Sequence, residues 1–77
     1  MVYTESVVIF LRLKELRSSR RLFQRDVAEA IGCTQAIYSR YESGTREPTI
    51  ATLVALADFY DVSLDYLVGR SDDPRRH

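Results

Sequence analysis

The chain has 77 residues, a length that suits one small domain. It holds one cysteine, Cys33, and one histidine, His77, so it forms no internal disulfide and lacks the soft ligands of a structural zinc site. Its 11 basic and 11 acidic residues give a formal net charge of zero, which taken alone argues against a nucleic-acid partner.

The distribution of charge points the other way. Residues 12–46 carry eight basic and four acidic side chains, whereas residues 47–77 carry six acidic and three basic ones. A phosphate-binding surface requires local positive potential rather than a basic total. Every basic residue except Lys14 is arginine, which suits two-point hydrogen bonding to phosphate and guanine, although genome composition explains this bias equally well.

The sequence contains no visible targeting or membrane-spanning segment. The apolar run at residues 7–10 is followed by Arg12 and Lys14 and is far too short to span a bilayer. A single unpaired thiol fits a reducing compartment. The expected location is therefore the cytoplasm, with no membrane partner.

Five helices are predicted from apolar periodicity and from the residues that begin and end them. In chain order they cover about 6–19, 24–31, 34–43, 49–60 and 63–69. Thr34, Thr49 and Ser63 can cap the last three helices, and Gly32 and Gly44 can end the second and third. The inner faces are expected to carry Phe10, Leu13, Leu16, Val27, Ala28, Ile31, Leu53, Leu56, Ala57, Tyr60, Leu64, Tyr66, Leu67 and Val68.

The predicted fold class is all-α, a compact bundle of five helices with short connections, because no strand-like alternation extends beyond a few residues. Residues 1–12 would form an N-terminal extension and the start of the first helix, and residues 13–69 the domain itself. Residues 70–77 form a polar tail that is expected to be flexible.

The most informative stretch is residues 24–43, where a short helix, a turn at Gly32 and Cys33, and a second helix follow one another. Two helices joined by a tight turn of this kind form the unit that places its second helix in the major groove of DNA. The first helix supports the second, so the small residue Ala28 suits their point of closest approach. Residues 34–43 are therefore predicted to be the recognition helix.

Beyond this unit, the sequence resembles the Cro and phage-repressor type of helix-turn-helix proteins, the XRE family, over residues 13–69. So many matching landmarks in register imply a lambda-repressor-like domain that binds double-stranded DNA. The matching segments are Leu16-Arg17, Gln24, Val27-Ala28-Glu29, Ile31-Gly32 and residues 39–44, 46–48 and 62–69.

The resemblance implies roles for individual residues. Base edges would be contacted by Gln35, Ala36, Ile37 and Arg40, and phosphates by Gln24, Thr34, Ser43, Thr45 and Arg46. The chemistry agrees, because an amide pairs with adenine, a guanidinium with guanine or phosphate, and an apolar side chain with a thymine methyl. A helix N-terminus also attracts phosphate. Which of the four base contacts determine sequence preference is left open.

The resemblance also implies structural roles. Family members pair an arginine late in the first helix with a glutamate near the end of the recognition helix, here Arg17 and Glu42. Tyr38 and Tyr41 lie three residues apart and are expected to pack inward, with exposed hydroxyls, rather than stack on bases. Cys33 is expected to be buried and inert.

Three positions depart from the family pattern. Phe23 stands where a capping residue is usual, which is expected to cost the second helix about 1 kcal/mol. Arg21 replaces a frequent glycine, and Asp61 replaces a common glycine or asparagine, although aspartate tolerates the left-handed region well. Arg20, Arg21 and Arg25 form a basic cluster that either contacts phosphates or is an ordinary solvated connection.

Val7, Val8, Ile9 and Leu11 place apolar side chains on more than one face of the first helix. One helix of a small domain cannot bury them all. They therefore predict either a thicker core or a surface for self-association or for a protein partner.

No catalytic constellation, metal site or cofactor site is visible, so no enzyme activity is expected. The predicted function is a sequence-specific transcriptional regulator, a repressor that binds an inverted repeat as a homodimer. The alternatives are an antitoxin or protein-interaction regulator of the same fold, and the DNA-binding half of a longer repressor.

Overall fold

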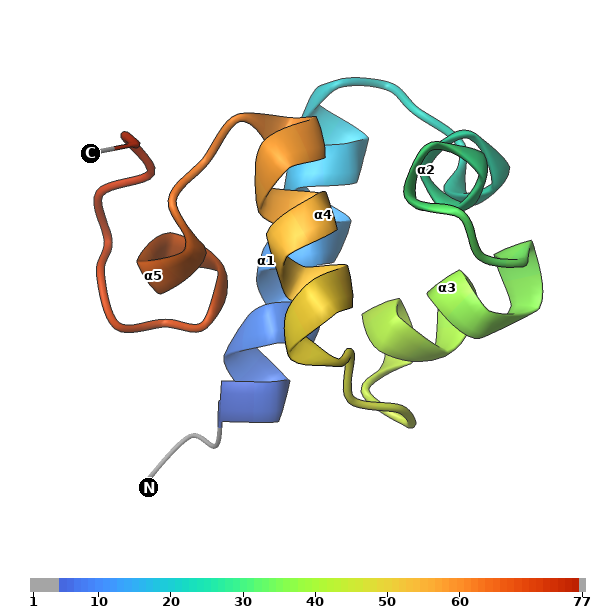
Figure 1. The fold of residues 1–77 in the computed structure, drawn as a ribbon, viewed down its shortest axis with the longest axis horizontal. Coiled ribbons are helices and arrows are strands. Elements are labelled where there is room, and N and C mark those ends of the chain that lie inside the picture. Colours follow the sequence, from blue (N-terminus) through green and yellow to red (C-terminus); the bar gives the residue numbers. More distant parts are fainter. Residues whose placement is uncertain (1–4, 77) are drawn as a thin grey trace.

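The structure is a computed structural model that describes residues 5–76. Within that range five helices follow one another without a strand, which confirms the all-α fold expected from the sequence. Figure 1 shows α1 and α4 at the centre, α2 and α3 on one side and α5 on the other. The helices are α1 (Glu5–Ser19), α2 (Gln24–Ile31), α3 (Gln35–Ser43), α4 (Ile50–Tyr60) and α5 (Leu64–Leu67). None of these helices is long and apolar enough to cross a membrane.

All five helices contribute to one core. Burial of each large apolar side chain contributes about 1.5–3 kcal/mol, so contributions from every helix make the domain a single cooperative unit. The largest fully buried side chains are Leu13 of α1, Val27 of α2, Tyr38 of α3, Leu56 and Tyr60 of α4, and Leu67 of α5.

The predicted helix caps are present. The hydroxyls of Thr34, Thr49 and Ser63 accept hydrogen bonds from backbone N–H groups in the first turns of α3, α4 and α5, at 3.2, 3.2 and 3.0 Å. Phe23 offers α2 no such oxygen. The carboxylate of Asp26 instead accepts the N–H of Phe23 at 2.9 Å, so this helix has only one half of a capping box.

Gly44 lies at the end of α3, in contact with Phe10 of α1. Its φ of +78° lies in the left-handed region, and a Cβ at this position would lie 2.9 Å from Cδ1 of Phe10. A side chain here would therefore both strain the backbone and displace the phenyl ring. The absence of a side chain allows Phe10 to pack directly against the C-terminal end of α3.

Residues 70–76, which the sequence predicts to be a flexible tail, lie against the helices in the structure. Arg12 of α1 donates to the carbonyl oxygens of Tyr66 and Ser71, the latter at 2.6 Å, and pairs with Asp72 at 2.9 Å. Arg76 donates to the carbonyl of Ala57 at 3.2 Å. These contacts link residues 70–76 to α1 and α4.

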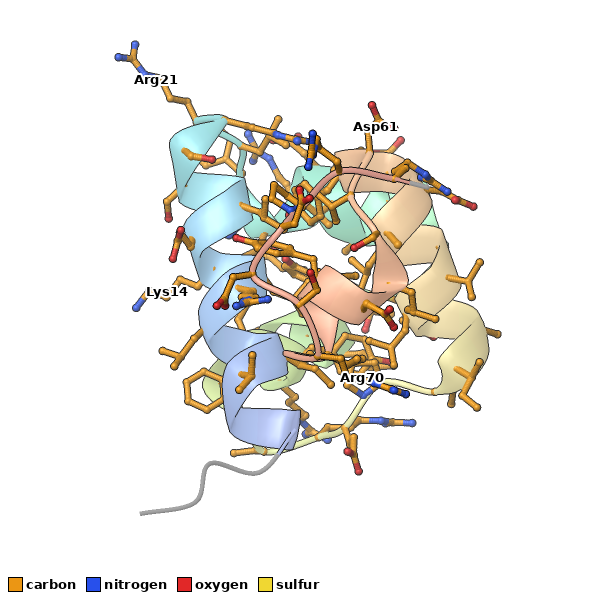
Figure 2. The ribbon with its side chains drawn as sticks, turned by 90° about the vertical axis from the view of Figure 1, so that its left-hand side faces the viewer. Lys14, Arg21, Asp61 and Arg70 are labelled. Atoms are coloured by element: carbon orange, nitrogen blue, oxygen red, sulfur yellow. The ribbon has the colours of Figure 1, made fainter. Side chains whose placement is uncertain are left out.

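Arg21 is held in an unfavourable backbone conformation after α1. Its φ is +56°, and Figure 2 shows its side chain extending away from the end of the helix into open space. Asp61 adopts a similar φ of +54° after α4, as its residue type allows. An arginine in this region is strained by about 1–2 kcal/mol, whereas a glycine is not.

We expect Arg21→Gly to raise the free energy of unfolding by about 0.5–1 kcal/mol, the relief of backbone strain less the greater entropy of glycine in the unfolded chain. Urea unfolding followed by circular dichroism measures the difference. Arg21→Ala is the matched control, because it removes the same charge and keeps the Cβ. An equal gain in both variants would assign the effect to charge rather than to the backbone.

Candidate nucleic-acid interface

The turn between α2 and α3 forms as the spacing of its residues predicts. Gly32 ends α2 with a φ of +78°, and the N–H of Cys33 donates to the carbonyl of Ala28 at 2.9 Å. Ala28 is buried, and α2 and α3 pack against each other. The pair therefore projects α3 from one side of the molecule, as Figure 1 shows.

The two sides of α3 differ sharply. Gln35, Ala36 and Arg40 are exposed, whereas Tyr38 and Tyr41 are buried. Ile37, the fourth expected base contact, is half-buried and packs against the core. The structure thus brings three of the four candidate side chains together on an open surface and turns the fourth partly inward.

Four of the five side chains expected at phosphates lie at the two ends of α3, and the fifth, Gln24, begins α2. Thr34 caps its N-terminus, and Ser43 hydrogen-bonds Thr45 at 2.9 Å beyond its C-terminus. Arg46 is exposed, and its N–H donates to the carbonyl of Arg40 at 3.3 Å. The loop after α3 is thereby folded back on the helix, which fixes where these residues present their side chains.

A buried ion pair holds α3 against α1. Arg17 donates from Nε to Oε2 of Glu42 at 2.7 Å and from Nη2 to Oε1 at 3.0 Å, while Nη1 donates to the carbonyl of Leu22 at 2.9 Å. Glu42 is only 6% exposed, and Gln24 of α2 donates to its Oε1 at 3.3 Å. α1 and α2 therefore converge on one carboxylate at the inner side of α3.

The hydroxyl of Tyr38 is buried, which corrects the expectation that it would be exposed. It lies 3.3 Å from the hydroxyl of Tyr60 on α4. Burial, together with hydrogen bonds to Tyr60 and Glu42, strongly raises the pKa of Tyr38, so it stays a neutral donor. The sequence could not reveal this because the partner lies 22 residues away.

The pKa of Glu42 is lowered in the folded protein. Burial acts to raise this pKa, but hydrogen bonds from Arg17, Tyr38 and Gln24, together with the charge of Arg17, outweigh it. At Cys33 burial also acts to raise the pKa, and there it outweighs a backbone hydrogen bond, so the pKa of the half-buried thiol is raised. The thiol is therefore a poor nucleophile.

Three of the basic side chains in residues 12–46 are engaged within the fold. Arg12 and Arg17 have the partners described above, and Arg20 donates to the carbonyl of Tyr60 at the end of α4. Within the basic cluster of Arg20, Arg21 and Arg25, Arg20 therefore makes a contact inside the protein. The exposed basic side chains of the same stretch are Lys14, Arg20, Arg21, Arg25, Arg40 and Arg46.

Two hollows adjoin this surface and share Arg17 and Gln24. One, of about 570 Å³, is lined also by Phe23, Arg25 and Gln35. The other, of about 340 Å³, lies between α1 and α3. Lys14 of α1, whose side chain extends outward in Figure 2, belongs to its lining.

Lys14 and Phe23 are members of this face that sequence reasoning missed. Lys14 lies one helical turn before Arg17 on α1, and that spacing was the available signal.

The sequence profile described as helix-turn-helix matches residues 13–67. The chain belongs to this family. It is 43% identical over 63 residues to the uncharacterized HTH-type transcriptional regulator YobD of Bacillus subtilis, covering 82% of this chain and 56% of that one. It is 39% identical over 61 residues to the cryptic phage CTXphi transcriptional repressor RstR of Vibrio cholerae, covering 79% and 55%.

A solved structure has the same fold. The P22 c2 repressor, crystallised with a synthetic operator, superposes with a TM-score of 0.73 at 25% identity, covering 77% of this chain and 89% of that one. The resemblance to phage-repressor-type proteins and the five-helix fold that it implied are thereby confirmed. The chain spans about half the length of the curated relatives it matches.

Stability should fall in acid because of Glu42. Its pKa is lower in the folded than in the unfolded chain, so the unfolded state takes up a proton first as pH falls. The stabilisation is therefore complete above the ordinary glutamate pKa, about 4.3, and is lost as pH falls through the lower folded value. Glu42→Gln should remove this pH dependence and reduce the free energy of unfolding at pH 7 by about 2–3 kcal/mol.

Urea unfolding at several values between pH 7 and pH 3 measures both effects. Glu15→Gln is the control, because it makes the same chemical change at an exposed position of α1. A wild-type slope that persists in Glu42→Gln would contradict the assignment.

Proposed function

We propose that the chain binds double-stranded DNA through α3 and regulates transcription as a repressor, as a homodimer on an inverted repeat. The observation that carries this proposal is the division of α3 into an exposed side with Gln35, Ala36 and Arg40 and an inner side fixed by Tyr38 and Glu42. Relatives that are transcriptional regulators and phage repressors support it, as does the repressor solved with its operator.

Base contacts are assigned to Gln35, Ala36, Ile37 and Arg40, with Ile37 limited to the part of its side chain that stays accessible. An amide at the start of the helix suits adenine, and a guanidinium one turn later suits guanine. Phosphate contacts are assigned to Gln24, Thr34, Ser43, Thr45 and Arg46. We also propose a cytoplasmic location and no catalytic step.

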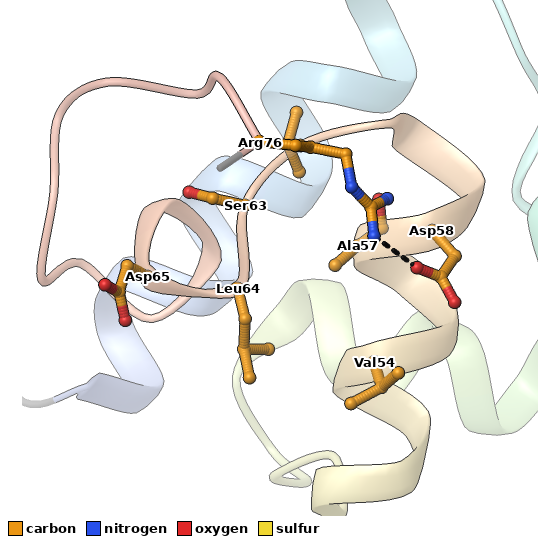
Figure 3. A pocket seen from close by; sticks show the side chains of 8 residues that line it. Val54, Ala57, Asp58, Ser63, Leu64, Asp65 and Arg76 are labelled. Carbon is orange, nitrogen blue, oxygen red and sulfur yellow. Dashed lines mark hydrogen bonds and ion pairs between the residues drawn. The ribbon is translucent and has the colours of Figure 1, made fainter.

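A dimer is proposed because one recognition helix contacts only a few base pairs, and two half-sites multiply the specificity. Val54 and Leu64 are exposed apolar side chains on either side of a hollow of about 320 Å³ between α4 and α5 (Figure 3). The expectation that Leu64 faces inward is therefore wrong. Ile50, also exposed, lies one turn before Val54. We take this α4–α5 face as the contact between the two copies.

The N-terminal apolar segment offers less surface than the sequence implied. Ile9 is buried, and Val8 lies against Gly69, where a Cβ would meet its side chain at 2.7 Å. Leu11 is 51% exposed, and the side chain of Val7 lies outside the described residues. Because Leu11 is still exposed, binding of a protein partner at this segment, as in an antitoxin, is the second candidate function.

The relatives' greater length favours the further alternative that these 77 residues are the DNA-binding part of a longer repressor.

Substitutions on α3 test DNA binding directly. After selection of an operator from random DNA, Gln35→Ala and Arg40→Ala should each cost about 1–3 kcal/mol of binding and relax preference at one position. Arg46→Ala should weaken binding to all sequences and lower the salt slope by about 1. Fluorescence anisotropy at several salt concentrations measures these changes. Wild-type affinity in both α3 variants would reject this face, and Arg75→Ala, an exposed arginine of the tail, is the control.

Charge introduced on the α4–α5 face should separate the dimer. Val54→Glu and Leu64→Glu should shift the mass measured by light scattering at high micromolar concentration toward the monomer, because each buries an unpaired charge at the interface. Leu11→Glu is the matched control on α1. A monomeric wild-type protein would contradict the dimer, and dissociation only in Leu11→Glu would move the interface to the N-terminal segment.

A further inference from the structure

Phe23 is an exposed aromatic side chain that the proposed contacts leave unexplained. It is 63% exposed, although transfer of a phenyl ring out of water is favourable. The other large exposed apolar side chains of the described residues lie on the α4–α5 face or on α1, but Phe23 adjoins Gln24 and Gln35 around the hollow of about 570 Å³. Its position next to two proposed DNA contacts calls for a function.

The backbone of Phe23 has no polar group left for a ligand. Its N–H is donated to Asp26, and its carbonyl accepts from the N–H groups of Asp26 and Val27 at 3.0 and 3.4 Å. These bonds fix its φ and ψ at −86° and 155°. What the residue offers to a partner is therefore its ring, carried on a fixed backbone at the start of α2.

Arg25 lies beside this ring. Its guanidinium carbon is 5.0 Å from the ring centroid, within the range of a cation–π contact. The hollow thus combines an apolar wall, Phe23, with the amides of Gln24 and Gln35 and the cation of Arg25. A fitting partner carries a negative group next to an apolar one and also accepts hydrogen bonds.

The edge of a DNA strand has this chemistry, because each phosphate adjoins an apolar deoxyribose ring, and thymine adds a methyl group in the major groove. We propose that Phe23 contacts DNA through its ring, against deoxyribose or thymine methyl carbons, while Arg25 binds the adjoining phosphate. This proposal rests on DNA binding through α3. It adds an apolar contact made by α2 at the margin of each half-site.

Phe23→Thr is the sharpest test because stability and affinity should change in opposite directions. Threonine restores the missing side-chain cap of α2, so the variant should unfold at higher urea concentration. Because the ring is lost, its affinity for the selected operator should fall about 5- to 10-fold. Phe23→Ala should lose the same affinity without the gain in stability, and Phe23→Leu should retain part of it.

The salt dependence separates the ring from its neighbour. The Phe23 variants should keep the wild-type salt slope, because no phosphate contact is lost, whereas Arg25→Gln should lower the slope by about 1. A deoxyribose contact and a thymine contact are distinguished by replacing each thymine of the half-site with uracil. If one such replacement weakens wild type but not Phe23→Ala, the contact is a methyl group, and if none does, it is deoxyribose.

Wild-type affinity in both Phe23→Thr and Phe23→Ala would overturn this proposal while leaving DNA binding through α3 intact. Failure of the wild-type protein to select any sequence would instead overturn the proposed function.

Discussion

The carboxylate of Glu42 is the group on which the orientation of the recognition helix depends. A charge that is almost fully buried is costly unless every lone pair is used, and here Arg17 and Gln24 donate to it from two other segments. Removal of Arg17 or Glu42 would leave the other without its ionic partner. The helix therefore has one well-defined position relative to α1 and α2, as the proposed contacts with DNA require.

Apolar and aromatic contacts on either side of the Arg17–Glu42 ion pair also fix α3 along its length. Tyr38 reaches α4 through Tyr60 in the middle of the helix, and Phe10 packs against Gly44 at its end. Together these contacts use the whole inner side of α3. The outer side needs no role in folding, so its side chains are available for contacts with bases.

Local patterns revealed the helices because caps, glycines and apolar spacing act within one or two turns. Thr34 and Gly32 are visible in this way, and both behave as the local rules predict. The contacts of Arg12 and Arg20 are not visible, because each guanidinium reaches a carbonyl at least 40 residues away in sequence. For the same reason the packing of residues 70–76 against the helices could not be predicted from the sequence. Only the fold brings a particular arginine to a carbonyl at the end of a distant helix.

The division of the arginines also resolves the puzzle of zero net charge. Part of the basic first half serves the scaffold, and the exposed remainder, with Lys14 lining a hollow beside α3, lies in residues 14–46. Several of the acids lie elsewhere, and Asp58 and Asp72 pair with Arg76 and Arg12. A small surface of positive potential is then compatible with a neutral protein, and the asymmetry favours one orientation toward a polyanion.

The loop between α1 and α2 is where the sequence departs most from good local chemistry. Arg21 has a left-handed backbone that glycine would adopt without strain, and Phe23 occupies a cap position without an oxygen. Both side chains are exposed, so neither departure is compensated by burial in the core. Violations of local rules in natural proteins concentrate at functional sites. Their position immediately before Gln24, at the margin of the proposed DNA surface, therefore supports a role for this loop in binding rather than in folding.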